Sequence, residues 1–216
     1  MKIVIQCAGK KRQDAGRLTT PAGKEVIFVA HPEKCPDPAY FCRPDDRIDS
    51  DHGTWREYLR SYNQSGVNPN KLCRARELYL PQIYRALVDK YGWQSVFILS
   101  AGWGLVRSDF LIPYYDITFS NRGKPESKRK PRDQFDDFNQ LEDCIAQNDE
   151  TIFFFGGQDY LSLYLKLTRG LAARKVIFHS QGNGYQIEGY ECIPYQGYTN
   201  WHYSCARDFM EGRIRI

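Results

Sequence analysis

Hydrophobic and polar positions follow two alternating patterns along the chain. Short, nearly continuous apolar runs are typical of buried strands, and they occupy residues 2–6, 95–99, 151–155, 175–179 and 190–194. Apolar residues at helical spacing predict helices over residues 75–91, 133–147, 160–169 and 200–211. This alternation predicts an α/β fold with a mainly parallel or mixed central sheet and flanking helices. In such a sheet, ligands bind beyond the carboxyl ends of the strands.

The pattern weakens between residues 18 and 72, where Pro, Asp and aromatic residues dominate. A segment of this length without clear periodicity indicates an insertion or a lid rather than a second domain. Its later part, residues 54–62, predicts a short helix. We therefore expect a single α/β domain over residues 1–216, with this insertion and with a basic loop at residues 120–132.

Composition indicates a globular protein and argues against membrane and secreted classes. A hydrophobic content of 42% and a charged content of 26% are those of an ordinary globular chain. No apolar run approaches the ~18 residues of a membrane helix, and the N-terminus lacks a signal-peptide pattern, so we predict no membrane partner. Seven cysteines, an odd number, favour a reducing cytoplasm. The spacing of His31, Cys35 and Cys42 matches no common zinc pattern. We predict neither a metal nor a cofactor for the chain. The sequence alone leaves open whether His31, Cys35 and Cys42 bind a metal.

The predicted strands at residues 2–6, 95–99 and 151–155 end in residues suited to a binding site. Glycines at these ends allow unusual backbone angles or close approach of a ligand, and polar side chains beyond them would face the crevice. Each end also has a simpler interpretation, namely a turn, a salt-bridge partner or a helix cap. The candidate catalytic residues are Asp116, Asp159, Tyr115 and Gln158. The candidate substrate-binding residues are Cys7, Ser100, Gly102, Trp103, Gly104, Gly157 and Tyr160.

Positive charge gathers in two segments near these strand ends. Residues 122–132 hold six cations against one acid, and three further cations follow the first strand. Such a run is either a solvated loop or an arm that neutralises phosphates, and both interpretations stay open. The candidate nucleic-acid contacts are Lys10, Lys11, Arg12, Arg122, Lys124, Lys128, Arg129, Lys130 and Arg132.

Residues 1–12 and about 73–170 resemble the YaaA-type peroxide-stress proteins and their shorter bacterial and phage relatives. The resemblance rests on a Leu-Tyr pair, a Ser-Ala-x-x-Gly-Leu-x-x-x-Asp motif and an Ile-x-x-Tyr-Asp motif. The matching positions are Leu78, Tyr79, Ser100, Ala101, Gly104, Leu105, Asp109, Ile112, Tyr115 and Asp116, with Cys7, Lys11 and residues 157–160 as further matches. The resemblance implies an α/β fold with a basic cleft that binds DNA. It implies no established reaction.

A shorter stretch, GGQDY at residues 156–160, is similar to the water-activating loop of uracil-DNA glycosylases. In those enzymes an Asp positions the hydrolytic water after a strand, which implies this role for Asp159. His179 and Ser180 follow a later strand and loosely resemble the His-Pro-Ser loop of the same enzymes. The Pro and the His that follow the Asp in that family are missing here.

Together these features predict a DNA-binding enzyme that acts on a nucleobase, specifically a DNA N-glycosylase working on double-stranded DNA with a flipped base. Trp103, Tyr115 and Tyr160 would stack on or wall the base, and Asp116 or Asp159 would stabilise the cationic sugar or orient water. A modified base and a role in anti-phage defence or the DNA damage response would suit the unmatched insertion. The alternatives are a non-catalytic DNA-binding stress protein and an enzyme of free nucleosides or nucleotides. No protein partner is predicted.

Overall fold

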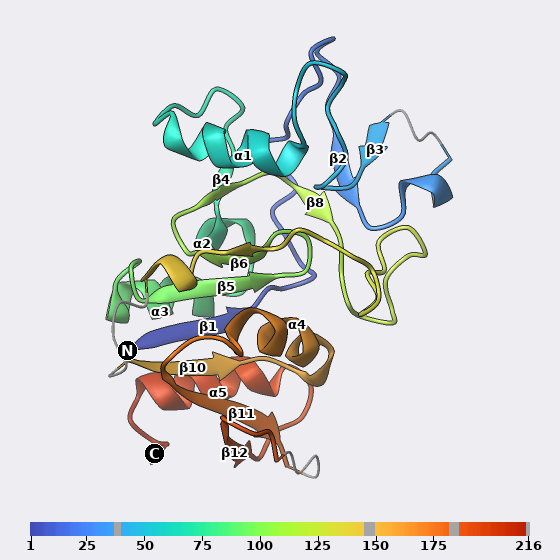
Figure 1. Cartoon of the computed structure of the whole chain (residues 1–216). Coiled ribbons are helices and arrows are strands. Elements are labelled where there is room, and N and C mark those ends of the chain that lie inside the picture. Colours follow the sequence, from blue (N-terminus) through green and yellow to red (C-terminus); the bar gives the residue numbers. More distant parts are fainter. Residues whose placement is uncertain (37–39, 145–149, 182–185, 215–216) are drawn as a thin grey trace.

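A seven-stranded sheet forms the centre of the computed structural model, which describes residues 1–36, 40–144, 150–181 and 186–214 (Figure 1). The strand order is β12 (Glu191–Tyr195), β11 (Arg174–Ser180), β10 (Thr151–Phe155), β1 (Lys2–Gln6), β5 (Val96–Ser100), β6 (Gly104–Arg107) and β9 (Phe138–Asn139). The strands from β12 to β5 are parallel, and β6 runs antiparallel to β5. The α/β prediction with a mainly parallel sheet is therefore confirmed.

Aromatic residues of β10 show why this sheet has helices on both faces. Phe153 and Phe155 contact Phe209 of α5, at ring-centroid distances of 4.7 and 5.3 Å. Phe154, which points the other way, stacks on Tyr164 of α4 at 4.0 Å. The helices are α1 (Trp55–Gln64), α2 (Ala75–Leu78), α3 (Ile83–Tyr91), α4 (Gln158–Thr168) and α5 (Trp201–Met210), with short 3-10 turns at Pro32–Lys34 and Glu142–Cys144. No helix in the described part of the chain is long and apolar enough to cross a membrane.

The insertion packs over one end of the molecule through small sheets. A three-stranded parallel sheet has the order β3 (Phe41–Cys42), β2 (Ile27–Val29) and β8 (Tyr115–Asp116), and β4 (Cys73–Arg74) pairs antiparallel with β7 (Leu111–Ile112). The helix predicted at residues 54–62 is confirmed as α1, which Thr54 and Glu57 begin with a reciprocal capping box. Because β2 pairs with β8, the insertion fixes the position of Tyr115 and Asp116.

Two predicted helices differ from the structure. The helix expected over residues 75–91 is broken between Leu78 and Ile83, where Pro81 cannot supply the backbone N–H that a helix interior needs. Leu80, expected on its buried face, is 56% exposed. The helix expected over residues 133–147 is wrong for the residues that the structure describes, since Phe138 and Asn139 form β9 instead. Residues 145–149 of that prediction lie outside the described residues.

Candidate functional site

The parallel strands point to one side of the molecule, and their ends form what we call the carboxyl rim: Gln6 with Cys7, Ser100, Gly156 with Gly157, and His179 with Ser180. In Figure 1 these ends lie on the side where the loop after β8 descends. The rim is tied together by side chains. The Gly157 N–H donates to the Gln6 side-chain oxygen at 2.6 Å, and the Tyr84 hydroxyl donates to the Gln6 carbonyl at 2.9 Å. The ends of β10, β1 and α3 therefore hold fixed positions relative to one another.

Buried phenols fill the centre of the rim. Ser100 Oγ donates to the Tyr115 hydroxyl at 2.9 Å, and that oxygen lies 2.8 Å from the Tyr79 hydroxyl. Cys7 Sγ lies 3.2 Å from the Tyr160 hydroxyl, within hydrogen-bonding range for sulfur. Burial raises the pKa of Tyr79, Tyr115 and Tyr160 well above the usual value, and the nearby Cys7 acts in the same direction. All three phenols are therefore neutral hydrogen-bond donors at physiological pH.

Lys11 lies against this phenol cluster. It is only 6% exposed, and its Nζ sits 4.2 Å from the centre of the Tyr115 ring. Among the described residues, Nζ has neither a hydrogen-bond acceptor nor an ion-pair partner. Burial lowers the pKa of Lys11, and the electrostatic effects of Cys7 and Asp116 oppose that shift without overcoming it. Lys11 was expected to contact phosphates from the surface, and its burial excludes that role in this conformation.

The two candidate carboxylates have different surroundings. Asp116 ends β8, is half-buried, and accepts a 2.8 Å hydrogen bond from Ser127 Oγ at its Oδ2. Asp159 is exposed in the first turn of α4. The helix cap there is Gly157, and it makes no side-chain cap bond, so Asp159 is not the cap of this helix. Asp116 is thus the carboxylate that acts electrostatically on the buried amine.

A small hollow lies between the ends of β10 and β11. Its volume of about 10 Å³ suits roughly one water molecule. Gly156, Gly157 and Gln158 line one side, His179 and Ser180 line the other, and Trp201 contributes a ring. The two segments that resemble uracil-DNA glycosylase loops are therefore neighbours in space.

The glycine-rich turn after β5 has a structural role. Trp103 is fully buried and packs edge-on against Phe28 at 5.0 Å, so it belongs to the core and does not wall an open pocket. A side chain at Gly102 would meet the Tyr115 ring at 3.0 Å. Gly104 has a φ of +84°, which favours glycine, and its strand approaches β9 closely. Arg56, a residue that no sequence signal indicated, donates to the carbonyls of Gly102 and Trp103 at 3.2 and 3.1 Å.

The basic loop divides into exposed and buried cations. Thr118, just before the loop, bridges to Lys128 within it. Arg129 is buried, contrary to its expected role at phosphates: it forms two 2.7 Å hydrogen bonds to the buried Asp137 and donates to the Ala101 carbonyl at 2.8 Å. Arg12 pairs with Asp14 at 2.6 Å and is half-buried. The cations of this group that remain exposed are Lys10, Arg122, Lys124, Lys130 and Arg132, and Lys128 is half-buried.

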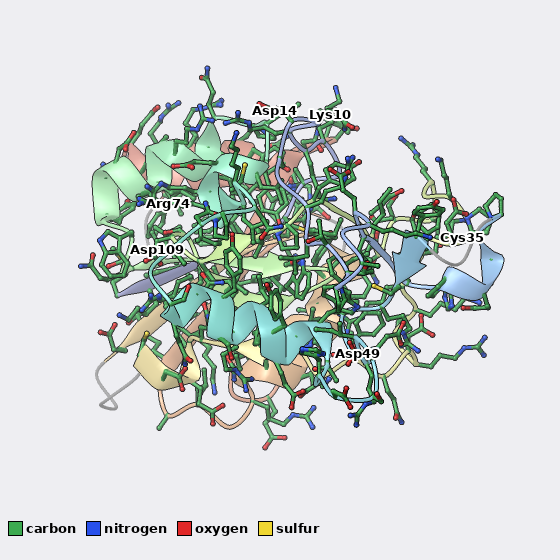
Figure 2. All side chains as sticks on the ribbon, turned by 90° about the horizontal axis from the view of Figure 1, so that it is seen from above. Lys10, Asp14, Cys35, Asp49, Arg74 and Asp109 are labelled. Carbon is green, nitrogen blue, oxygen red and sulfur yellow. The ribbon has the colours of Figure 1, made fainter. Side chains whose placement is uncertain are left out.

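A larger hollow of about 940 Å³ lies at the opposite ends of the strands and contains none of the predicted site residues. Arg74 and Asp109, two of its lining residues, lie together on the side away from Cys35 (Figure 2). Arg107 pairs with Asp109 at 3.2 Å and covers the Trp93 ring. The charges that line the larger hollow are of both signs and partly paired with one another. The buried amine of Lys11 lies instead beside the carboxyl rim, so we place the candidate site at the rim.

Comparison with known families gives one result. A family model described as a family of unknown function (DUF6884) matches residues 65–191, which is more than half of the chain. The match spans β5, β8, β10 and β11, and so most of the carboxyl rim. No curated protein matches the sequence.

Proposed function

The chain belongs to the DUF6884 family, whose function is unknown, and we propose that it is a DNA-binding enzyme that hydrolyses the N-glycosidic bond of a nucleobase. One observation carries the proposal. The carboxyl rim gathers a half-buried carboxylate, a buried amine and neutral phenols beside a loop of exposed cations. Seven free cysteines support a reducing, cytoplasmic location.

The proposed chemistry assigns a role to each group. Cleavage of the bond develops positive charge on the sugar, which a nearby carboxylate stabilises. We assign this role to Asp116, and keep Asp159 as the second candidate for orienting water. The departing base takes up negative charge, and a neutral phenol such as Tyr160 can donate a hydrogen bond to it. Gln158, exposed beside the small hollow, can contact a base edge.

The exposed cations support a nucleic-acid substrate over a free nucleoside. Phosphate contacts fix a protein on DNA without reading its sequence, and they come mainly from Lys and Arg. Arg122, Lys124, Lys130 and Arg132 project from one loop beside the rim, and Lys10 follows β1 (Figure 2 labels Lys10). An enzyme of free nucleosides has no need of so many exposed cations in one place.

Entry of a base requires the basic loop to move. Phe119 lies edge-on against Tyr160 at 5.1 Å, and Tyr115 is fully buried. A flipped base would take the place of Phe119 and stack near Tyr160, since enzymes of this class hold the extruded base between aromatic side chains. The insertion adjoins this entry through the pairing of β2 with β8. We extend the proposal to a bulky or sugar-modified base, which would suit defence against phages with altered DNA.

The test is release of free bases. Purified protein is incubated with genomic DNA from phages of differing base chemistry, with unmodified DNA and with free nucleosides, and the filtrate is analysed by mass spectrometry. We expect one class of base to be released from DNA, with abasic sites left behind. Binding of every DNA without any released base would refute the reaction and favour the non-catalytic alternative. Release from free nucleosides alone would refute the DNA substrate.

A further inference from the structure

Lys11 occupies a position that a surface lysine does not. Its backbone is held on both sides, because the Leu80 N–H donates to the Lys10 carbonyl at 3.2 Å and the Arg12 N–H donates to the Leu78 carbonyl at 2.8 Å. Lys11 also bridges to Tyr79. Two exposed or half-exposed cations thus flank a lysine whose side chain turns inward, onto the Tyr115 ring.

The surroundings of the amine do not match those of a structural lysine. Buried lysines are usually paired with a carboxylate or with backbone carbonyls. Lys175 of this chain is an example, because its Nζ donates to the Leu171 carbonyl at 2.9 Å. Among the described residues, Nζ of Lys11 has no such acceptor. The contact of this amine is the Tyr115 ring, and a desolvated lysine without a carboxylate or carbonyl acceptor keeps a larger fraction of neutral, nucleophilic amine than an exposed lysine, which is the form used by imine-forming enzymes.

We propose that Lys11 is a nucleophile that forms an imine with the ring-opened sugar aldehyde of an abasic site in DNA. This rests on the proposed function, because base release leaves that aldehyde in the same site. The assignment follows from the buried position of Lys11, the absence of a hydrogen-bond acceptor among the described residues, and the contact of its Nζ with the Tyr115 ring.

The proposed step balances as follows. The neutral amine attacks the C1′ carbonyl carbon, a C–N bond forms, and the carbonyl oxygen leaves as water after gaining two protons, which gives a protonated imine. Loss of a proton from C2′ then breaks the C3′–O bond, and the 3′ phosphate departs with the electron pair. Water hydrolyses the imine and returns the amine. Asp116 acts electrostatically on Lys11, and we assign it to carry these protons.

Trapping tests this step without depending on base release. The probe is a DNA duplex that carries a preformed abasic site, incubated with the protein and sodium cyanoborohydride, which reduces an imine to a stable amine link. We expect a covalent adduct that peptide mass spectrometry maps to Lys11. The adduct should be lost in Lys11→Arg. It should be retained in the control variant Lys90→Ala, because Lys90 is an exposed lysine on α3 at the other end of the strands.

The outcomes of trapping and of base release separate a failure of the Lys11 inference from a failure of the proposed function. An adduct that maps to Lys10 or another surface lysine, or that persists undiminished in Lys11→Arg, overturns the inference. Mapping on the wild-type protein keeps the test valid if Lys11→Arg does not fold. Base release without an adduct overturns this inference alone, and an adduct without base release from any DNA overturns the proposed function alone. Neither adduct nor base release overturns both.

Discussion

The buried ion pair between Arg129 and Asp137 allows the loss of unfolding free energy on its removal to be predicted. The Asp137 side chain is fully buried and Arg129 is 4% exposed, and the pair shares two hydrogen bonds of 2.7 Å. Asp137→Asn keeps the shape but leaves a buried guanidinium without its counter-charge. Breaking a buried pair in this way costs about 3–5 kcal/mol of unfolding free energy. With a urea slope of about 3 kcal/mol per molar, the unfolding midpoint should fall by roughly 1–1.7 M.

The assay is urea unfolding followed by tryptophan fluorescence, with two comparisons. Lys166 contacts the same carboxylate at 3.2 Å but is 58% exposed, so Lys166→Ala should cost less than about 1 kcal/mol. Replacing both partners by apolar residues, as in Arg129→Met with Asp137→Leu, should recover most of the loss. If Asp137→Asn unfolds within about 1 kcal/mol of the wild type, the pair is not the buried anchor described above.

Two further predictions concern the amine and the basic loop. Burial lowers the folded-state pKa of Lys11 against the opposing electrostatic effects of Cys7 and Asp116, so the unfolded state binds more protons and the free energy of unfolding rises with pH below about pH 10. Relative to Lys11→Met, the wild type should therefore gain stability between neutral and alkaline pH in urea titrations, and a constant difference would contradict this. Replacing Arg122 and Lys124 by Ala should make the slope of log affinity for DNA against log salt shallower by about 0.9 per cation. An unchanged slope would remove this loop from the DNA-binding surface.

The parallel sheet could be predicted because its signal is local. The run TIFFF at residues 151–155 is apolar and buried after its first residue, and a strand covered on both faces requires that composition. The same holds for VFILS, of which every residue is buried. Alternation with helical patterns then leads to the right fold class.

The failed helix over residues 133–147 shows where local patterns mislead. Phe135, Phe138 and Leu141 are buried, as helical spacing predicts. They are buried for other reasons: Phe138 enters the sheet beside Gly104, and Phe135 lies under the Arg129 guanidinium at 4.0 Å. The first contact joins residues 34 positions apart and the second depends on the fold of the basic loop, and no periodicity reports either of them.

Several candidate site residues that are far apart in the sequence contact one another in the fold. Ser100, Tyr115, Tyr160 and Cys7 do meet at the rim. The exposed or buried state of a cation, however, depends on what packs around it. Residues 10–12 are three adjacent cations, and the buried one is Lys11, which bridges to Tyr79. That pairing links a strand end to a helical segment more than sixty residues later, which a single sequence does not reveal.

The central claim is that the carboxyl rim is the chemical centre and that Asp116 is its carboxylate. The most direct measurement is the single-turnover rate of base release by wild type, Asp116→Asn and Asp159→Asn, on whichever DNA the wild type cleaves, with DNA affinity measured in parallel. We predict that Asp116→Asn loses about 10²–10³ of the rate while binding DNA normally, the loss typical of one electrostatic group in a site. Asp159→Asn should lose less. Full activity in Asp116→Asn would contradict the account.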